Sequence, residues 1–264
     1  LDRAKGVKFP GIPGFLLNTN TDTLLKRDFD RWRGHKASPL MVAAGLEHLR
    51  PFQHEDIGKW ESSLQFGSSP NHFNTLHEET NILFGGGLDD VWINLETDEL
   101  HIVDYKSTSQ KSDGKEITLD DPWKAAYKRQ MDLYVWVMRQ KGFNVSDKGY
   151  FLYCDGDRFS DYDFLGTQYA VMKFKMSLLP YTVDTSWIEP TLFDVKECLD
   201  GPRCPDHNPY CEHGHFLNAS STFNFKGTFF PPRMPSSAVI TISQSASRIL
   251  SFSDSGEKPP KTTE

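Results

Sequence analysis

Carboxylates and a lysine are concentrated in one stretch of the chain, FGGGLDDVWINLETDELHIVDYKSTS, which covers residues 84–109. Asp89 and Asp90 lie near its start, and Asp104 and Lys106 lie near its end. Carboxylates held close together raise one another's pKa unless a cation lies between them, and burial adds to the cost. Mg²⁺ would remove that conflict, because it binds carboxylate oxygens and completes its octahedron with water and substrate phosphate. The stretch therefore favours metal-assisted chemistry on a phosphate ester.

Two strand-like runs are expected to position these side chains. Residues 81–95 and 100–107 flank the segment ETDE, which fits a hairpin turn. Such a turn brings Asp89 or Asp90 opposite Asp104, within about one residue of register. Because neighbouring side chains of a strand point to opposite faces, we expect one of these two aspartates to face the metal and the other to be solvated or structural on the opposite face.

The lysine has a role distinct from that of the metal. Asp104 and Lys106 share one face of the expected strand, because alternate side chains point the same way. An ammonium beside a metal-bound water can orient or help deprotonate the nucleophile and stabilise the charge that develops on a scissile phosphate. The alternative is a Lys–Asp surface pair on an edge strand, which would contribute little.

Further helices and strands are predicted on either side of the hairpin. The segment NTNTDTLLKRDFDRWR, residues 18–33, has capping residues followed by apolar residues at helical spacing, and 40–48 fits a shorter helix. No regular element is expected over 51–80 or in the charged loop 110–121, whereas strands are expected over 148–154 and 173–183 and a helix over 185–199.

A long helix is predicted over residues 122–141, PWKAAYKRQMDLYVWVMRQK. Asp121 suits its N-cap and Gly142 its C-terminal cap. The stripe expected to face inward carries Trp123, Tyr127, Gln130, Tyr134 and Val137. A buried amide needs hydrogen-bond partners, so Gln130 is either a site residue or an incidental neighbour of a core tyrosine.

Three motifs occur in a fixed order: G-x-x-D at Gly86–Asp89, D-x-K at Asp104–Lys106 and Q-x-x-x-Y at Gln130–Tyr134. This order resembles the PD-(D/E)XK nuclease superfamily, and more narrowly its RecB-type, Cas4-like branch. The resemblance covers residues 1 to about 217. It implies an α/β fold with a restriction-endonuclease-like core, in which helices flank a central mixed β-sheet, and a nuclease that uses Mg²⁺ or Mn²⁺ to cleave DNA.

The same resemblance implies a role for each motif residue. The metal ligands would be Asp89, Asp104 and the backbone carbonyl of Tyr105. Lys106 would activate the attacking water, and Gln130 and Tyr134 would contact the lysine or the DNA backbone.

A further metal ligand is expected on the first helix. Sequences of the RecB-type branch normally place a His there, and the nearest equivalent in this chain is Asp22. A carboxylate binds Mg²⁺ well. The alternatives to ligation are a helix-capping Asp22 or a solvent-facing Asp28.

Three cysteines lie close together late in the chain: Cys198, Cys204 and Cys211. Relatives of the branch often hold a 4Fe–4S cluster with one early and three late cysteines, but the other cysteine here, Cys154, is most simply a buried small residue on a strand. The late cysteines therefore predict an iron–sulfur cluster, a Zn²⁺ site with mixed Cys and His ligands, or free thiols.

The net charge of −7 would ordinarily argue against a nucleic-acid partner, since phosphate binding depends on Lys and Arg. The acidity is local, because residues 61–121 carry thirteen Asp and Glu against three Lys and Arg. A solvated acidic face and a metal site both explain such an excess.

The chain has neither an apolar run of about 18 residues nor a signal-peptide pattern, which predicts a soluble cytoplasmic protein. We expect a nuclease domain over 1–217 and a low-complexity, disordered tail over 218–264. The function expected is that of an exonuclease in DNA repair or defence, working with a helicase or a similar protein. The alternatives are an inactive nucleic-acid-binding module of the same fold, or an interaction domain stabilised by zinc or an iron–sulfur cluster.

Overall fold

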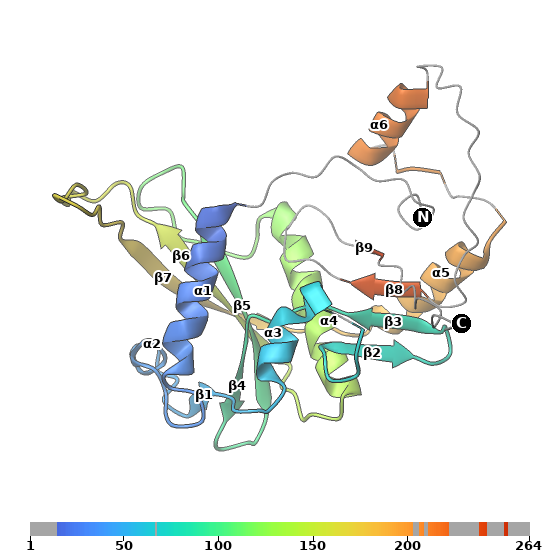
Figure 1. Cartoon of the computed structure of the whole chain (residues 1–264), viewed down its shortest axis with the longest axis horizontal. Coiled ribbons are helices and arrows are strands. Elements are labelled where there is room, and N and C mark those ends of the chain that lie inside the picture. Colours follow the sequence, from blue (N-terminus) through green and yellow to red (C-terminus); the bar gives the residue numbers. More distant parts are fainter. Residues whose placement is uncertain are drawn as a thin grey trace, which may run out of the picture.

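A mixed five-stranded sheet forms the centre of the protein (Figure 1). The computed structural model describes residues 15–66, 68–202, 206–208, 211–221, 238–241 and 251–252. The strands, in their order across the sheet, are β1 (Leu49–Pro51), β4 (Asp90–Asn94), β5 (Leu100–Thr108), β6 (Lys148–Gly156) and β7 (Phe174–Thr182). β5 and β6 run parallel and the other neighbours antiparallel, so the predicted α/β fold with a mixed sheet is confirmed.

Helices cover both faces of this sheet. The helices of the described chain are α1 (Leu16–Asp30), α2 (Pro39–Ala43), α3 (Ile57–Phe66), α4 (Ala125–Gln140), α5 (Ile188–Asp200) and α6 (Glu212–Ser221), with a short 3₁₀ turn η1 (Pro122–Lys124) before α4; α6 lies apart from the sheet. Phe29 of α1 packs with Val103 and Tyr105 of β5. Tyr134 of α4 packs with Ile102 on the other face. Because alternate residues of β5 face different helices, this strand lies between α1 and α4.

A second sheet lies beside α4, in the order β2 (Asn74–His77), β3 (Ile82–Gly85), β8 (Ala238–Thr241) and β9 (Ser251–Phe252). The single strand predicted over 81–95 is therefore wrong: it is two strands in two sheets. The glycines at the break allow a close approach, since a Cβ on Gly86 would lie 2.5 Å from the Tyr134 ring.

The prediction of no regular element over 51–80 is also wrong, because α3 and β2 lie there. Only a few apolar residues lie in or beside these elements. Trp60 of α3 and Phe73, which directly precedes β2, are both fully buried in the core shared with α4. The two elements are too short to show a clear hydrophobic period in the sequence. Packing against distant parts of the chain stabilises them.

The predicted helix over 122–141 is η1 followed by α4, and Gly142 follows its end with a φ of +90°. Gln130, Tyr134 and Val137 are buried as expected, but Trp123 is 56% exposed. Trp123 lies in the 3₁₀ turn, whose three residues per turn rotate it off the α-helical stripe.

The elements predicted before the β4–β5 hairpin and after α4 are confirmed. These are α1, α2, β6, β7 and α5, which overlap the expected ranges. The boundary predicted at residue 217 falls within α6, and the division into domain and tail stays a prediction. Most of 218–264 lies outside the described residues, apart from the end of α6, β8 and β9. In the part of the chain that the structure describes, no helix is long and apolar enough to cross a membrane.

Candidate active site

The β4–β5 hairpin brings two carboxylates together at the end of the sheet. Asp98 occupies the turn with a φ of +57°. Asp90 pairs with Val103 in the antiparallel ladder, so the preceding Asp89 comes level with Asp104. The backbone N–H of Tyr105 donates to Oδ2 of Asp89 over 2.7 Å, which fixes the carboxylate in place. The register predicted from the turn is confirmed.

A connected chain of buried polar side chains runs from β5 to α4. The Lys106 ammonium forms an ion pair with Oδ2 of Asp104 and lies 3.4 Å from Oε1 of Gln130, to which it donates. Nε2 of Gln130 donates in turn to the Tyr134 hydroxyl over 2.9 Å. Asp104 is 1% exposed and Lys106 7% exposed. The alternative of a surface pair on an edge strand is wrong, because β5 is internal and both groups are buried.

The electrostatics of this site favour a bound cation. Burial raises the pKa of Asp89 and of Asp104, and Asp89 raises that of Asp104 further. Burial alone would lower the pKa of Lys106, but the two carboxylates raise it above its usual value. Lys106 is therefore an ammonium donor in this arrangement, and it also lies 4.6 Å from the centre of the Tyr127 ring.

The donor set fits a small divalent metal. Oδ1 of Asp104 is buried and has no hydrogen-bond donor among the described residues, so one carboxylate oxygen is open to a cation. The described part of the chain contains no group of three or more His, Cys, Asp or Glu that could hold a metal. Asp89 and Asp104 are thus the two side-chain candidates, and main-chain oxygen and water would complete the shell, as Mg²⁺ allows.

Asp22 reaches this site only through a lysine. Lys26 of α1 lies 3.2 Å from Oδ2 of Asp22 and 3.7 Å from Oδ1 of Asp89. The helix begins at Leu16, so the alternative that Asp22 caps it is wrong, whereas Asp28 is exposed to solvent as expected. Sequence reasoning missed Lys26, although its spacing of four residues from Asp22 places both on one helix face.

Asp90 forms hydrogen bonds and an ion pair on the face of the hairpin opposite to Asp104 and Lys106. It is fully buried, so the solvated reading is wrong and the structural one holds. Its Oδ1 lies 3.0 Å from Nη1 of Arg33, and its Oδ2 accepts hydrogen bonds from the Trp92 indole at 3.0 Å and the Tyr105 hydroxyl at 2.9 Å. Arg33, which lies far from Asp90 in the sequence, carried no signal that predicts this contact.

Glu61 of α3 is expected to make stability depend on pH. Its carboxylate lies 3.7 Å from Nη2 of Arg33, but burial outweighs that attraction and raises the pKa of Glu61 to about 7. The folded state then holds a proton that the unfolded state loses near pH 4.5, so stability falls as pH rises from about 4.5 to 7. Glu61→Gln should therefore be more stable than the native chain by about 1–2 kcal/mol at pH 8 and equal to it at pH 4.

Urea unfolding of the two proteins at pH 4, 6 and 8 measures this difference. If the ion pair with Arg33 dominated instead, the Gln variant would be the less stable protein at pH 8.

The late cysteines are only partly described. Cys198 and Cys211 are half-buried and not in a disulfide, and Cys204 lies outside the described residues. Cys154 is buried on β6, as predicted. The backbone N–H of Gly214 lies 3.4 Å from Sγ of Cys211 and donates to it, as at many helix starts. A cluster or zinc site at these cysteines stays a prediction.

Two carboxylates and a buried lysine, which one hairpin presents at the end of a mixed sheet, fit the class of metal-dependent hydrolases of phosphate esters. The chain belongs to the PD-(D/E)XK nuclease superfamily, whose family model matches residues 19–172, more than half of its length. Members of this superfamily are nucleases that cleave phosphodiester bonds, typically with Mg²⁺ or Mn²⁺. No curated protein and no solved structure gives a significant match.

Proposed function

We propose that this protein is a Mg²⁺- or Mn²⁺-dependent deoxyribonuclease. The observation that carries the proposal is the buried chain from Asp104 through Lys106 and Gln130 to Tyr134, which lies opposite Asp89. Burying an ion pair with its hydrogen-bond partners costs free energy, and a stable fold does not require it. Strongly shifted carboxylates and a lysine held together in this way are more typical of a catalytic site.

Each residue has a distinct part in the proposed reaction. Asp89, Asp104 and the carbonyl of Tyr105 would hold the metal. When bound, the metal would polarise the phosphate and lower the pKa of a water molecule. The Lys106 ammonium donates toward the charge that develops on the phosphate. Gln130 orients that ammonium through its Oε1, and Tyr134 fixes the amide of Gln130 by accepting from its Nε2.

The finer assignment rests on the order of the motifs. G-x-x-D, D-x-K and Q-x-x-x-Y follow one another as in the RecB-type, Cas4-like branch, which supports an exonuclease of DNA repair or defence that works with a helicase. The glycine of the first motif, Gly86, lies against the Tyr134 ring of the third, so the motifs are also adjacent in space.

The proposal predicts metal-dependent cleavage. Labelled single-stranded and double-stranded DNA should be degraded by the native chain with Mg²⁺ or Mn²⁺, and EDTA should abolish degradation because Asp89 and Asp104 then lack their cation. Gel analysis of the products over time also separates removal of terminal nucleotides from internal cuts. An inactive binding module would retain the DNA without shortening it under every metal condition, and that outcome would contradict the proposal.

A further inference from the structure

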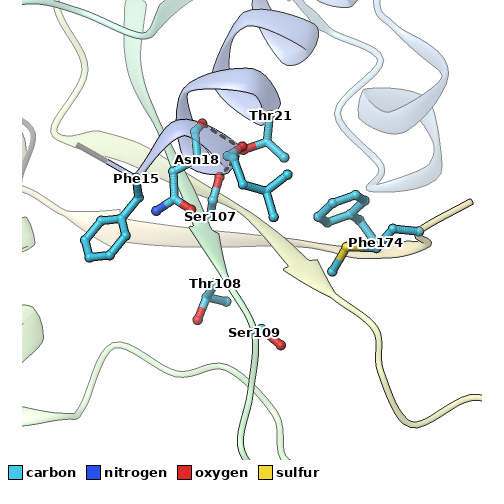
Figure 2. Close-up of a pocket in the computed structure, with 9 residues that line it drawn as sticks. Phe15, Asn18, Thr21, Ser107, Thr108, Ser109 and Phe174 are labelled. Atoms are coloured by element: carbon cyan, nitrogen blue, oxygen red, sulfur yellow. Dashed lines mark hydrogen bonds between the residues drawn. The ribbon is translucent and has the colours of Figure 1, made fainter. Parts of the chain in front are cut away.

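A pocket of about 260 Å³ lies beside the candidate active site, between the start of α1, the end of β5 and the start of β7 (Figure 2). Phe15 and Phe174 lie at opposite sides of it in this view, and Asn18, Thr21 and Ser107 lie between them. The complete lining is Phe15, Leu17, Asn18, Thr21, Ser107, Thr108, Ser109, Met172 and Phe174.

The pocket is continuous with the catalytic strand. Ser107, Thr108 and Ser109 directly follow Lys106, and a strand rises only about 3.3 Å per residue. On the other wall, Thr21 directly precedes Asp22, which reaches Asp89 through Lys26. A contact between the hydroxyls of Thr21 and Ser107 joins the two walls. A group bound here would contact the residues of β5 that directly follow Lys106.

The chemistry of the lining selects a neutral, flat ligand. None of the nine lining residues carries a charge, so the pocket is not suited to a phosphate group. Two phenyl rings and the Met172 thioether offer surfaces for stacking. Its volume falls just below the range of about 300–1,000 Å³ that is typical for drug-sized ligands, which fits a single ring system.

Two polar side chains of the lining are available to form hydrogen bonds with the edge of such a ring. Within the described part of the chain, the side-chain amide of Asn18 and the hydroxyl of Thr108 make no hydrogen bond. The hydroxyl of Ser109 donates to the Gly156 carbonyl over 3.1 Å, and that of Thr21 donates to the Asn18 carbonyl over 2.8 Å. Asn18 can both donate and accept, as recognition of a base edge requires.

We propose that this pocket is a nucleobase subsite, which binds one unstacked base of the substrate strand next to the cleaved phosphate. The inference rests on the proposed nuclease function, which it deepens by specifying the substrate. A base can enter only when it is splayed out of a duplex, so the pocket selects single-stranded or locally opened nucleic acid.

The segment between β6 and β7 extends this apolar surface. It exposes large side chains at Phe159, Phe164, Leu165, Tyr169, Val171 and Met172. A soluble protein rarely exposes so many large apolar groups in one short segment without a binding role. Since Met172 also lines the pocket, neighbouring bases of the bound nucleic-acid strand can stack along the segment between β6 and β7.

Binding to oligonucleotides with one missing base tests the subsite. Single-stranded oligonucleotides, each with an abasic nucleotide at a different position, are titrated with the native chain in EDTA, and fluorescence anisotropy measures Kd. One position should weaken binding about 5- to 100-fold, the range for loss of one stacked base. Phe174→Ala should weaken binding of the intact strand similarly and make it insensitive to that abasic position, whereas Phe174→Trp should retain the sensitivity.

Matched variants separate the subsite from loss of folding. Phe193→Ala removes a phenylalanine from α5 that is more exposed than Phe174 and lies outside the pocket, and it should bind the whole series like the native chain. Thr108→Val keeps the side-chain shape and should weaken binding about 3- to 10-fold with the intact base only. Equal sensitivity at every position, or equal weakening of intact and abasic strands by Phe174→Ala, would overturn the proposal.

Failure of the subsite and failure of the nuclease function give different results. Binding is measured without a divalent metal, and cleavage is measured separately with Mg²⁺. If the native chain cleaves DNA but Phe174→Ala does not change the sensitivity of binding to the abasic position, the subsite proposal is contradicted and the nuclease function is not. Coupling without cleavage would support the pocket and contradict the nuclease function.

Discussion

Lys106→Met is expected to reduce metal-dependent DNA cleavage by at least about 10²–10³-fold, the usual effect of removing one donor from a developing negative charge. The ammonium of Lys106 is oriented from two sides, by the Asp104 carboxylate and by Oε1 of Gln130. Methionine keeps an unbranched side chain as far as Cε and lacks the ammonium group, so the loss of rate reports on the ammonium itself. Initial rates on a labelled oligonucleotide with Mg²⁺ measure the effect.

Stability has to be followed in the same variant, because Lys106 is buried beside Asp104. Removing one member of a buried pair leaves the other uncompensated, which commonly costs about 3–5 kcal/mol. The double variant Lys106→Met with Asp104→Asn removes both charges, so it should recover much of the stability without recovering activity. Thermal unfolding of both proteins separates the two effects.

A matched control is Lys111→Met, which removes an exposed lysine from the loop between β5 and η1. It should cleave at the native rate. Full cleavage by the folded Lys106→Met protein would show that the ammonium is not part of the reaction, and would remove the main support for the proposed mechanism.

The adjacent aspartates Asp89 and Asp90 should give opposite phenotypes. Asp90→Ala is expected to lower the free energy of unfolding by about 3–5 kcal/mol, because it leaves the buried Arg33 guanidinium without its fully buried carboxylate partner. It also removes the acceptor of the Trp92 indole and of the Tyr105 hydroxyl. Urea unfolding without metal measures this loss.

Asp89→Asn should leave the metal-free protein as stable as the native chain or slightly more stable. Burial raises the pKa of Asp89, so its charge opposes folding, and the amide oxygen of Asn can still accept from the Tyr105 N–H. Cleavage with Mg²⁺ should nevertheless fall sharply, because a neutral amide binds the ion more weakly than a carboxylate. Equal destabilisation by both substitutions, with equal activity, would contradict the division of roles between the two faces.

The hairpin and its candidate site could be predicted from the sequence because they depend on local geometry. The side chains of a strand alternate, which places Asp104 and Lys106 on one face. The turn at ETDE fixes the register of Asp89, and a spacing of four residues aligns Gln130 with Tyr134 on α4. The motif residues therefore meet in the structure through the same periodicities that are visible in the chain.

Other features were decided only by the tertiary structure. Lys26 contacts Asp89 because α1 packs across the hairpin, and Arg33 reaches Asp90 from the turn that follows the C-terminal end of that helix. The elements of the polar region 51–80 depend on burial of Trp60 and Phe73 against α4.

The two kinds of feature differ in physical origin. Backbone geometry repeats every few residues, so a sequence carries the strand, the turn and the helix face directly. Burial and ion pairing depend on which distant segments pack together, and no local pattern encodes that choice. The sequence by itself thus determined the stretch from Phe84 to Ser109 as a hairpin that places Asp89, Asp104 and Lys106 together. Only the packed structure decided that Asp90 serves the fold, that Lys26 joins the site, and that a pocket opens beside β5.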